Sequence, residues 1–79
     1  MSAEPIIPAE IAAHVLWHEG EGGHPAGSFT TALLIAWAHA DHANEARLAA
    51  EWPEYAAAYA LFAQPGGIAR LREIAEAAQ

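Results

Sequence analysis

Alanine is the most frequent residue in this chain, and its abundance constrains the fold more than any other feature of the sequence. Alanine has the best helix propensity of all residues, whereas the β-branched residues here are too few and too scattered to form several strands. A chain of 79 residues buries only about 60 % of the surface that its unfolded form exposes, which is too little for a second core. We therefore predict a single all-α domain over residues 1–79.

Turn and cap residues divide the chain into five helical segments. They run from near Pro8 to Gly20, from Ser28 to about Ala40, over about 42–51, from Pro53 to Pro65, and from Ile68 towards the carboxyl end. The glycine-rich stretch 21–27 resembles a flexible linker but is too short to separate domains. The expected fold is a compact bundle of four to five short helices.

The segment at about 28–40 has almost no polar side chain. A helix that is apolar on nearly every side is usually buried, so we expect this one to be the buried central helix, or to lie partly in a subunit interface. Ser28 before it and Asp41 after it are candidate caps, because a serine or aspartate oxygen accepts a hydrogen bond from an amide two or three residues further on. Asn44 lies in the first turn that Asp41 would cap.

Aromatic residues gather near the helix ends and along one later segment. Trp52 and Pro53 mark a helix break, since proline disfavours the α conformation in the residue before it. Three aromatic residues, Tyr55, Tyr59 and Phe62, follow at spacings of four and three. This aromatic stripe can belong to the core or can dock a partner helix. Tryptophans at helix ends can leave their N–H at the surface and anchor a partner. The candidate partner-binding residues are thus Trp17, Trp52, Tyr55, Tyr59 and Phe62.

The last segment is the clearest amphipathic helix of the chain. Ile68, Leu71 and Ile74 recur at helical spacing and predict its buried side. Arg72 and Glu76, four residues apart, are expected on its exposed side.

One pattern extends over about residues 25–62 and consists of 25–34 (PAGSFTTALL), Ala40-Asp41, Asn44, Leu48 and Trp52-Pro53. This pattern resembles that of small uncharacterised proteins of actinobacteriophages and their prophages. Here Ala26 is inserted between the proline and the glycine, and Trp52 replaces what is often phenylalanine. The resemblance implies a phage accessory protein that engages a host or phage protein, or is a minor component of the phage machinery. It implies no catalytic residue.

Charge and composition exclude several classes of protein. The net charge is -7, with Arg47, Arg70 and Arg72 against ten acids, so ordinary nucleic-acid binding is disfavoured and a basic partner is favoured. Acidic mimicry of DNA is a further hypothesis. The absence of cysteine excludes disulfides and thiolate sites. With neither a signal-peptide pattern nor a run of roughly 20 apolar residues, we expect a cytoplasmic protein, in the host cell if a phage encodes it.

Histidine is the one enrichment that suggests chemistry. His14, His18 and His24 have the spacing of metzincin protease ligands, but Val15 stands where the catalytic glutamate is required and Glu21 replaces the turn glycine. A non-catalytic zinc module remains an alternative hypothesis. Its candidate ligands are His14, His18, His39 and His42.

No spacing of nucleophiles, carboxylates or glycines in the chain matches a catalytic or phosphate-binding motif. We therefore expect a non-enzymatic protein without a cofactor or small-molecule substrate. Its expected function is protein–protein interaction, with self-association into a homo-oligomer as one form of it.

Overall fold

The computed structural model describes residues 7–77 and shows five helices and no strand among them. The helices are α1 (Ala9–His18), α2 (Ser28–His39), α3 (His42–Glu51), α4 (Pro53–Phe62) and α5 (Gly67–Glu76). The predicted all-α bundle is confirmed, and each predicted segment contains one helix. Residues 1–6, which bear on the signal-peptide prediction, lie outside the described residues.

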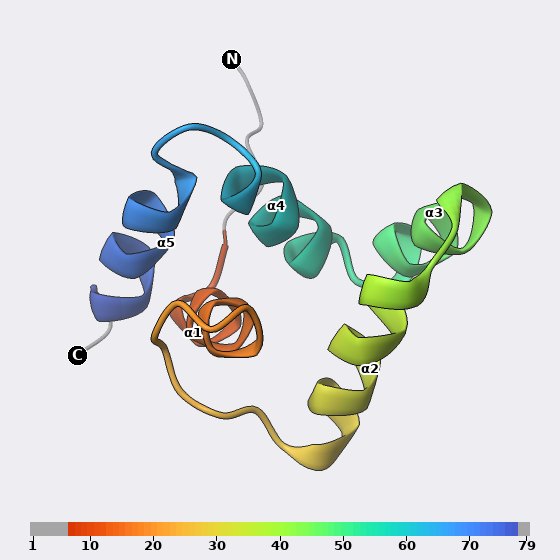
Figure 1. The fold of residues 1–79 in the computed structure, drawn as a ribbon, viewed down its shortest axis with the longest axis horizontal. Coiled ribbons are helices and arrows are strands. Elements are labelled where there is room, and N and C mark those ends of the chain that lie inside the picture. The colour runs from red at the N-terminus through yellow and green to blue at the C-terminus, as the bar shows by residue number, and fades with distance from the viewer. Residues whose placement is uncertain (1–6, 78–79) are drawn as a thin grey trace.

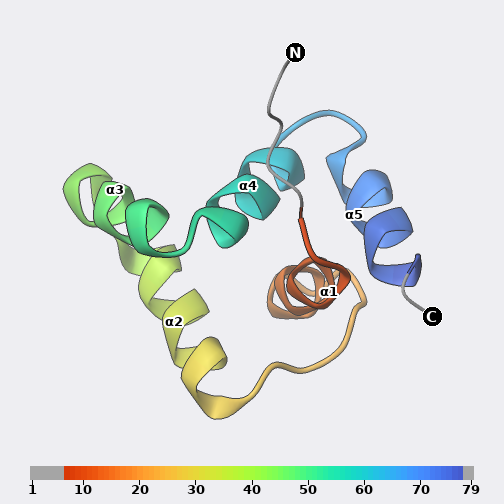
Figure 2. The ribbon, with the colours of Figure 1, turned by 180° about the vertical axis from the view of Figure 1, so that it is seen from behind.

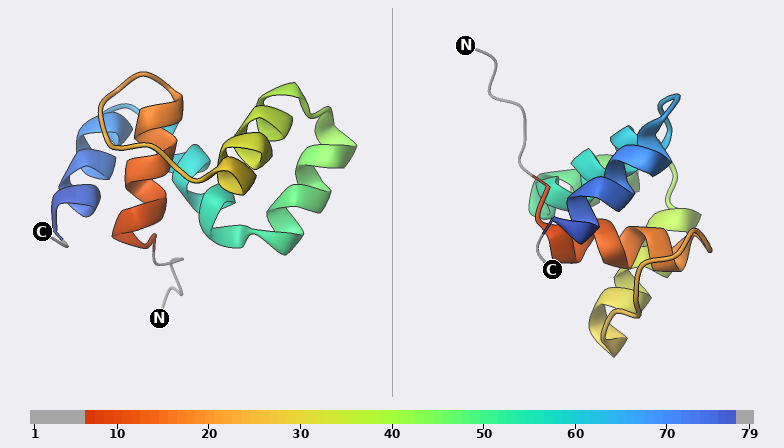
Figure 3. Two further views of the ribbon diagram at one scale, coloured as in Figure 1. Left: turned by 90° about the horizontal axis from the view of Figure 1, so that it is seen from below. Right: turned by 90° about the vertical axis from the view of Figure 1, so that its left-hand side faces the viewer.

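Helices α1, α4 and α5 pack against one another, with α1 in contact with both of the others (Figure 1). Viewed from behind, the same three helices again lie together, and α2 and α3 stand beside them (Figure 2). The pair α2–α3 joins the rest through contacts of α3 with α4 and of α2 with α1. The molecule is flattened, with extents of 35 × 33 × 20 Å, and Figure 3 shows it in two further views.

The core lies where the side chains of four helices meet. Its buried residues are Ala12, Val15 and Leu16 of α1, Leu33, Leu34 and Trp37 of α2, Tyr55 and Ala58 of α4, and Leu71 of α5. Helix α3 buries no residue completely, although Leu48 and Ala49 pack against the core. In α5, Leu71 is fully buried while Arg72 and Glu76 are exposed, as its amphipathic pattern predicted.

Helix α2 begins where the sequence predicted but is not the buried centre of the domain. Only three of its residues are buried, and Phe29 and Ile35 are exposed. The neighbours on one side of α2 are too few to cover an apolar helix all round. The helix with the longest buried run is α1, from Ala12 to Leu16. The prediction of a buried central helix at 28–40 is therefore wrong, and its apolar surface is partly open.

One of the two predicted caps is confirmed. Asp41 precedes α3, and its carboxylate accepts a 2.9 Å hydrogen bond from the Asn44 backbone N–H. Ser28 is instead the first residue of α2, and Gly27 is the N-cap, with no side-chain hydrogen bond. Because Ser28 already has helical backbone angles, its hydroxyl lies one position too late to act as a cap.

The connector between α1 and α2 is held against the helices, contrary to its linker-like composition. Gly23 has φ of +67°, and a Cβ at this position would collide with the Ala13 backbone oxygen. The Arg72 guanidinium of α5 donates hydrogen bonds to Glu21 in the same connector.

Among residues 7–77, none of the helices combines the length and apolarity needed to span a lipid bilayer.

Candidate functional site

One side of α2 presents apolar side chains to solvent. Phe29 is 67 % exposed and Ile35 is 48 % exposed. Ala32 lies one helical turn from each of them, and Ala36 follows Ile35; both alanines are exposed. Leu33, Leu34 and Trp37 point to the opposite side, into the core. We call Phe29, Ala32, Ile35 and Ala36 the α2 face. No residue of α2 is an acid, a lysine or an arginine, so this face carries no fixed charge.

The α2 face continues to neighbouring helices at both ends. Near its start, the Phe29 ring lies 6.2 Å from the Trp52 ring, between α3 and α4. Near its end, a groove of about 410 Å³ opens between α2 and α3. Its lining includes Ala36, Leu48 and Arg47. The apolar surface is therefore wider than one helix, and the Arg47 side chain lies at its edge.

The predicted aromatic anchors fall into two groups. Trp17 is 36 % exposed, and Trp52 is half-buried against Phe29. Tyr55 is buried, which corrects its assignment as a partner-binding residue, because the stripe on α4 faces the core. Tyr59 and Phe62 are half-buried and pack against that core. The stripe is thus mainly structural.

The histidines of α1 do not form a shared ligand site. His14 is buried, with its ring set edge-on to the His24 ring at 6.1 Å and its Nε2 atom 3.9 Å from the Glu10 carboxylate. His14 Nδ1 has no hydrogen-bond partner within residues 7–77. His18 is half-buried, one turn further along α1.

The second histidine pair is also divided. His39 ends α2 and donates a 2.9 Å hydrogen bond from Nδ1 to the Ile35 backbone oxygen, while His42 begins α3. In the part of the chain that the structure describes, no group of three or more histidine and carboxylate side chains is arranged to hold a metal ion. The four predicted ligands are not brought together.

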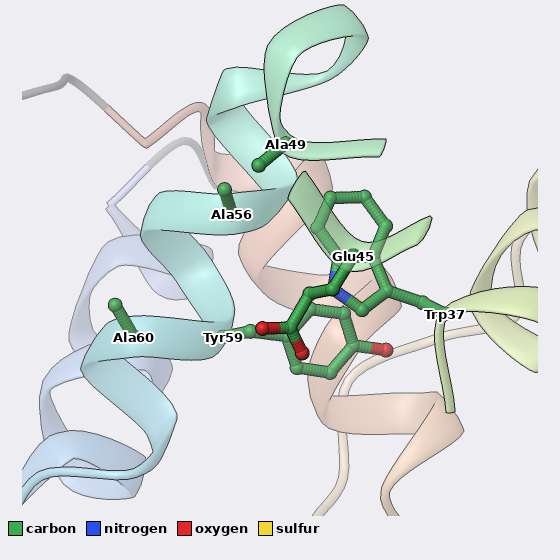
Figure 4. Close-up of a pocket in the computed structure, with 6 residues that line it drawn as sticks. All are labelled: Trp37, Glu45, Ala49, Ala56, Tyr59 and Ala60. Atoms are coloured by element: carbon green, nitrogen blue, oxygen red, sulfur yellow. The ribbon is translucent and has the colours of Figure 1, made fainter. Parts of the chain in front are cut away.

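A second hollow region lies on the core side of α2. Trp37, Glu45 and Tyr59 converge on it from α2, α3 and α4, and Figure 4 shows their side chains pointing toward one another. Ala49, Ala56 and Ala60 complete its wall, and its volume is about 260 Å³. An adjoining hollow of about 270 Å³ shares the same three convergent residues and is also lined by Glu19. We call the two hollows together the aromatic pocket.

The Tyr59 hydroxyl is the least satisfied polar group of the aromatic pocket. It is buried and has no hydrogen-bond partner among the described residues. Burial, and then the negative charge of Glu19, raise the pKa of Tyr59 above its usual range. The direction of that pKa shift means that the hydroxyl is a neutral group close to a carboxylate at physiological pH.

Comparison of the chain with protein-family models, curated proteins and solved structures finds no match. The resemblance to small phage proteins therefore stays a prediction. The arrangement of side chains is the basis for a functional proposal.

Sequence reasoning named Tyr59 as a functional candidate but missed Phe29, Ile35, Trp37 and Glu45. For α2 a signal was present, because positions 29, 32 and 36 share one helix side and positions 33, 34 and 37 share the other. For the aromatic pocket no signal was available, since Trp37, Glu45 and Tyr59 come from three helices whose packing no local pattern encodes.

Proposed function

We propose that the protein is a non-enzymatic protein-binding domain, an accessory protein of a phage or prophage that binds or modulates a host or phage protein. The α2 face carries this proposal. An uncovered, uncharged apolar surface that includes an exposed aromatic residue is typical of protein interaction sites. The resemblance over residues 25–62 supports the phage assignment, and α2 lies inside that stretch.

Phe29 offers the largest apolar contribution that the α2 face makes to binding a partner. Phe29 is 67 % exposed, and covering that part of a phenylalanine removes about 100–170 Å² from water, which stabilises a complex by roughly 3 kcal/mol. Ile35 and the α2–α3 groove add to this area. A helix or loop of another protein that docks there leaves the Arg47 guanidinium at the edge of the contact.

The test compares three baits in a lysate of the cell that carries the gene: the wild type, Ile35→Glu and Ala69→Glu. Ala69 is exposed on α5, so Ala69→Glu adds the same charge away from the α2 face. We expect a protein that wild type and Ala69→Glu retain and Ile35→Glu loses. The retained protein is then purified, and its affinity is measured by calorimetry.

The salt dependence of the affinity distinguishes apolar docking, acidic DNA mimicry and self-association. Apolar docking gives a negative heat-capacity change and an affinity that changes little with salt, whereas acidic DNA mimicry gives an affinity that falls steeply with salt. Self-association of two copies, each with a net charge of -7, strengthens with salt because like charges are screened. A partner retained equally by Ile35→Glu, or a chain that binds nothing and is strictly monomeric by light scattering, contradicts the proposal.

A further inference from the structure

The aromatic pocket combines two aromatic walls with an acidic mouth. The Trp37 and Tyr59 rings lie with centroids 5.6 Å apart and planes inclined by 34°. The faces of such rings carry partial negative charge and attract cations placed over them. Glu45 lines both hollows and Glu19 lines one of them. Every electrostatic feature of the pocket therefore favours positive charge.

The three arginines of the chain do not supply that charge. Within residues 7–77, neither Glu19 nor Glu45 belongs to an ion pair. Arg70 and Arg72 are engaged by Glu73 and Glu21. The remaining arginine, at position 47, points its guanidinium at the Asn44 side chain and lines the groove on the other side of α3.

The acceptors that a ligand can reach in the pocket are carboxylates. The Tyr59 hydroxyl is buried without a partner in the described part of the chain, whereas Glu45 and Glu19 are exposed. Two carboxylates suit a ligand rich in N–H donors.

Size narrows the ligand further. Each of the two hollows that form the pocket, of about 260 and 270 Å³, is by itself smaller than a drug-sized site, which spans roughly 300–1,000 Å³. The wall of Ala49, Ala56 and Ala60 is apolar and smooth, which suits the aliphatic part of a ligand. A short alkyl chain that ends in a charged head group fits this description.

We infer that the aromatic pocket binds an organic cation, an ammonium or guanidinium group on a short aliphatic chain. The head group lies against the Trp37 and Tyr59 rings, and its N–H groups donate to the carboxylates of Glu45 and Glu19. A lysine or arginine side chain of a protein and a free polyamine share this chemistry. The site faces away from the α2 face and does not depend on it.

The test uses butylammonium and propylguanidinium as probes and 1-butanol as their neutral control, at constant ionic strength. Binding is followed by proton–nitrogen NMR at the Trp37 indole N–H, which a Trp37→Phe variant assigns. We expect saturable shifts of this resonance with both cations and none with 1-butanol. Equal shifts with the alcohol, or no saturation with either cation, overturn the inference.

Charge variants of exposed residues test the pocket without threatening the fold. Glu45→Gln and Glu19→Gln are each expected to weaken cation binding on the order of tenfold. Glu51→Gln, an equal charge change on α3 outside the pocket, leaves the affinity within about twofold because an exposed distant charge is screened. If all three variants weaken binding equally, only the net charge matters and the site is refuted.

The source of the cation is settled by comparing spermidine with a capped trilysine peptide of the same charge. Tighter binding of spermidine assigns a free polyamine, and tighter binding of the peptide assigns a side chain of a protein partner. Either result, if lost in Glu45→Gln, supports the pocket. Ile35→Glu leaves both affinities unchanged, so failure here is distinguishable from failure of the α2 face.

Discussion

The Arg72 guanidinium of α5 binds Glu21 through both its backbone and its side chain. Nε and Nη2 donate to the Glu21 carbonyl oxygen at 3.2 and 3.0 Å, and Nη2 also donates to the carboxylate at 3.1 Å. The two residues are separated by 51 positions. This contact ties the α1–α2 connector to the last helix and closes the domain on one side.

Removal of this contact is expected to destabilise the fold more than removal of an ordinary surface pair. Arg72→Met keeps the aliphatic stem, and we expect it to lower the free energy of unfolding by about 1 kcal/mol, because two hydrogen bonds and an ion pair are lost together. Arg70→Met loses only an exposed pair with Glu73, and is expected to cost roughly 0.3 kcal/mol. Urea unfolding measures both. Equal losses would show that Arg72 does not hold the connector.

Substitution of Gly23 and of Gly20 by alanine compares the cost of a steric collision with the cost of a left-handed backbone conformation. Both have positive φ, +67° and +76°, but a Cβ has open space at Gly20 and meets the Ala13 backbone oxygen at Gly23. Gly20→Ala is expected to cost about 1–2 kcal/mol from the left-handed conformation alone. Gly23→Ala is expected to cost at least about 1 kcal/mol more, since backbone must move. Thermal unfolding of the two variants compares them, and a similar loss in both contradicts the close approach.

Much of this fold was predictable because its signals are local. Helix propensity, the Asp41 cap and the Trp52-Pro53 break depend on residues a few positions apart, and the structure confirms the helices and that cap. The Ser28 cap was missed by one position, because a serine before an apolar run does not show whether its own backbone is already helical.

What could not be predicted depends on contacts between distant residues. Arg72 has Glu76 four positions away, yet its partner is Glu21, which only the packing of the connector brings within reach. The apolarity of α2 indicated burial, but burial requires neighbours on all sides, and none covers Phe29 and Ile35 within the described chain. The same open side supplies the α2 face of the candidate site.

Adjacent residues of α2 test which side faces the core. Leu34 is fully buried and Ile35 is 48 % exposed. Leu34→Ala is expected to cost about 2–5 kcal/mol, a large part of the about 4–12 kcal/mol typical of a domain of this size. Ile35→Ala is expected to change stability by no more than about 0.5 kcal/mol. Urea unfolding measures the stability of both variants. A larger loss for Ile35→Ala than for Leu34→Ala would show that Ile35, and not Leu34, faces the core.

The stability of the protein at alkaline pH reports on the tyrosines, because the chain has neither lysine nor cysteine side chains that titrate in the same range. Burial raises the pKa of Tyr59 above its ordinary value of 10.0, with the Glu19 charge acting in the same direction, and burial also raises the pKa of Tyr55. The folded protein therefore keeps these protons to higher pH than the unfolded chain. Stability from this source is fully present below the ordinary pKa and is lost as the pH rises towards the folded pKa.

We expect the urea midpoint to be steady from about pH 8 to the ordinary tyrosine pKa and to fall above it. Tyr59→Phe should reduce the fall, and near neutral pH it should cost little, since it removes a hydroxyl that has no partner within residues 7–77. Tyr55→Phe is the comparison, because burial also raises the pKa of Tyr55 while a hydrogen bond with Thr30 opposes that rise. Near-ultraviolet absorbance of the phenolate follows ionisation directly. If Tyr59 ionises at its ordinary pKa in the folded protein, its hydroxyl is in contact with water and the aromatic pocket is more open than the structure shows.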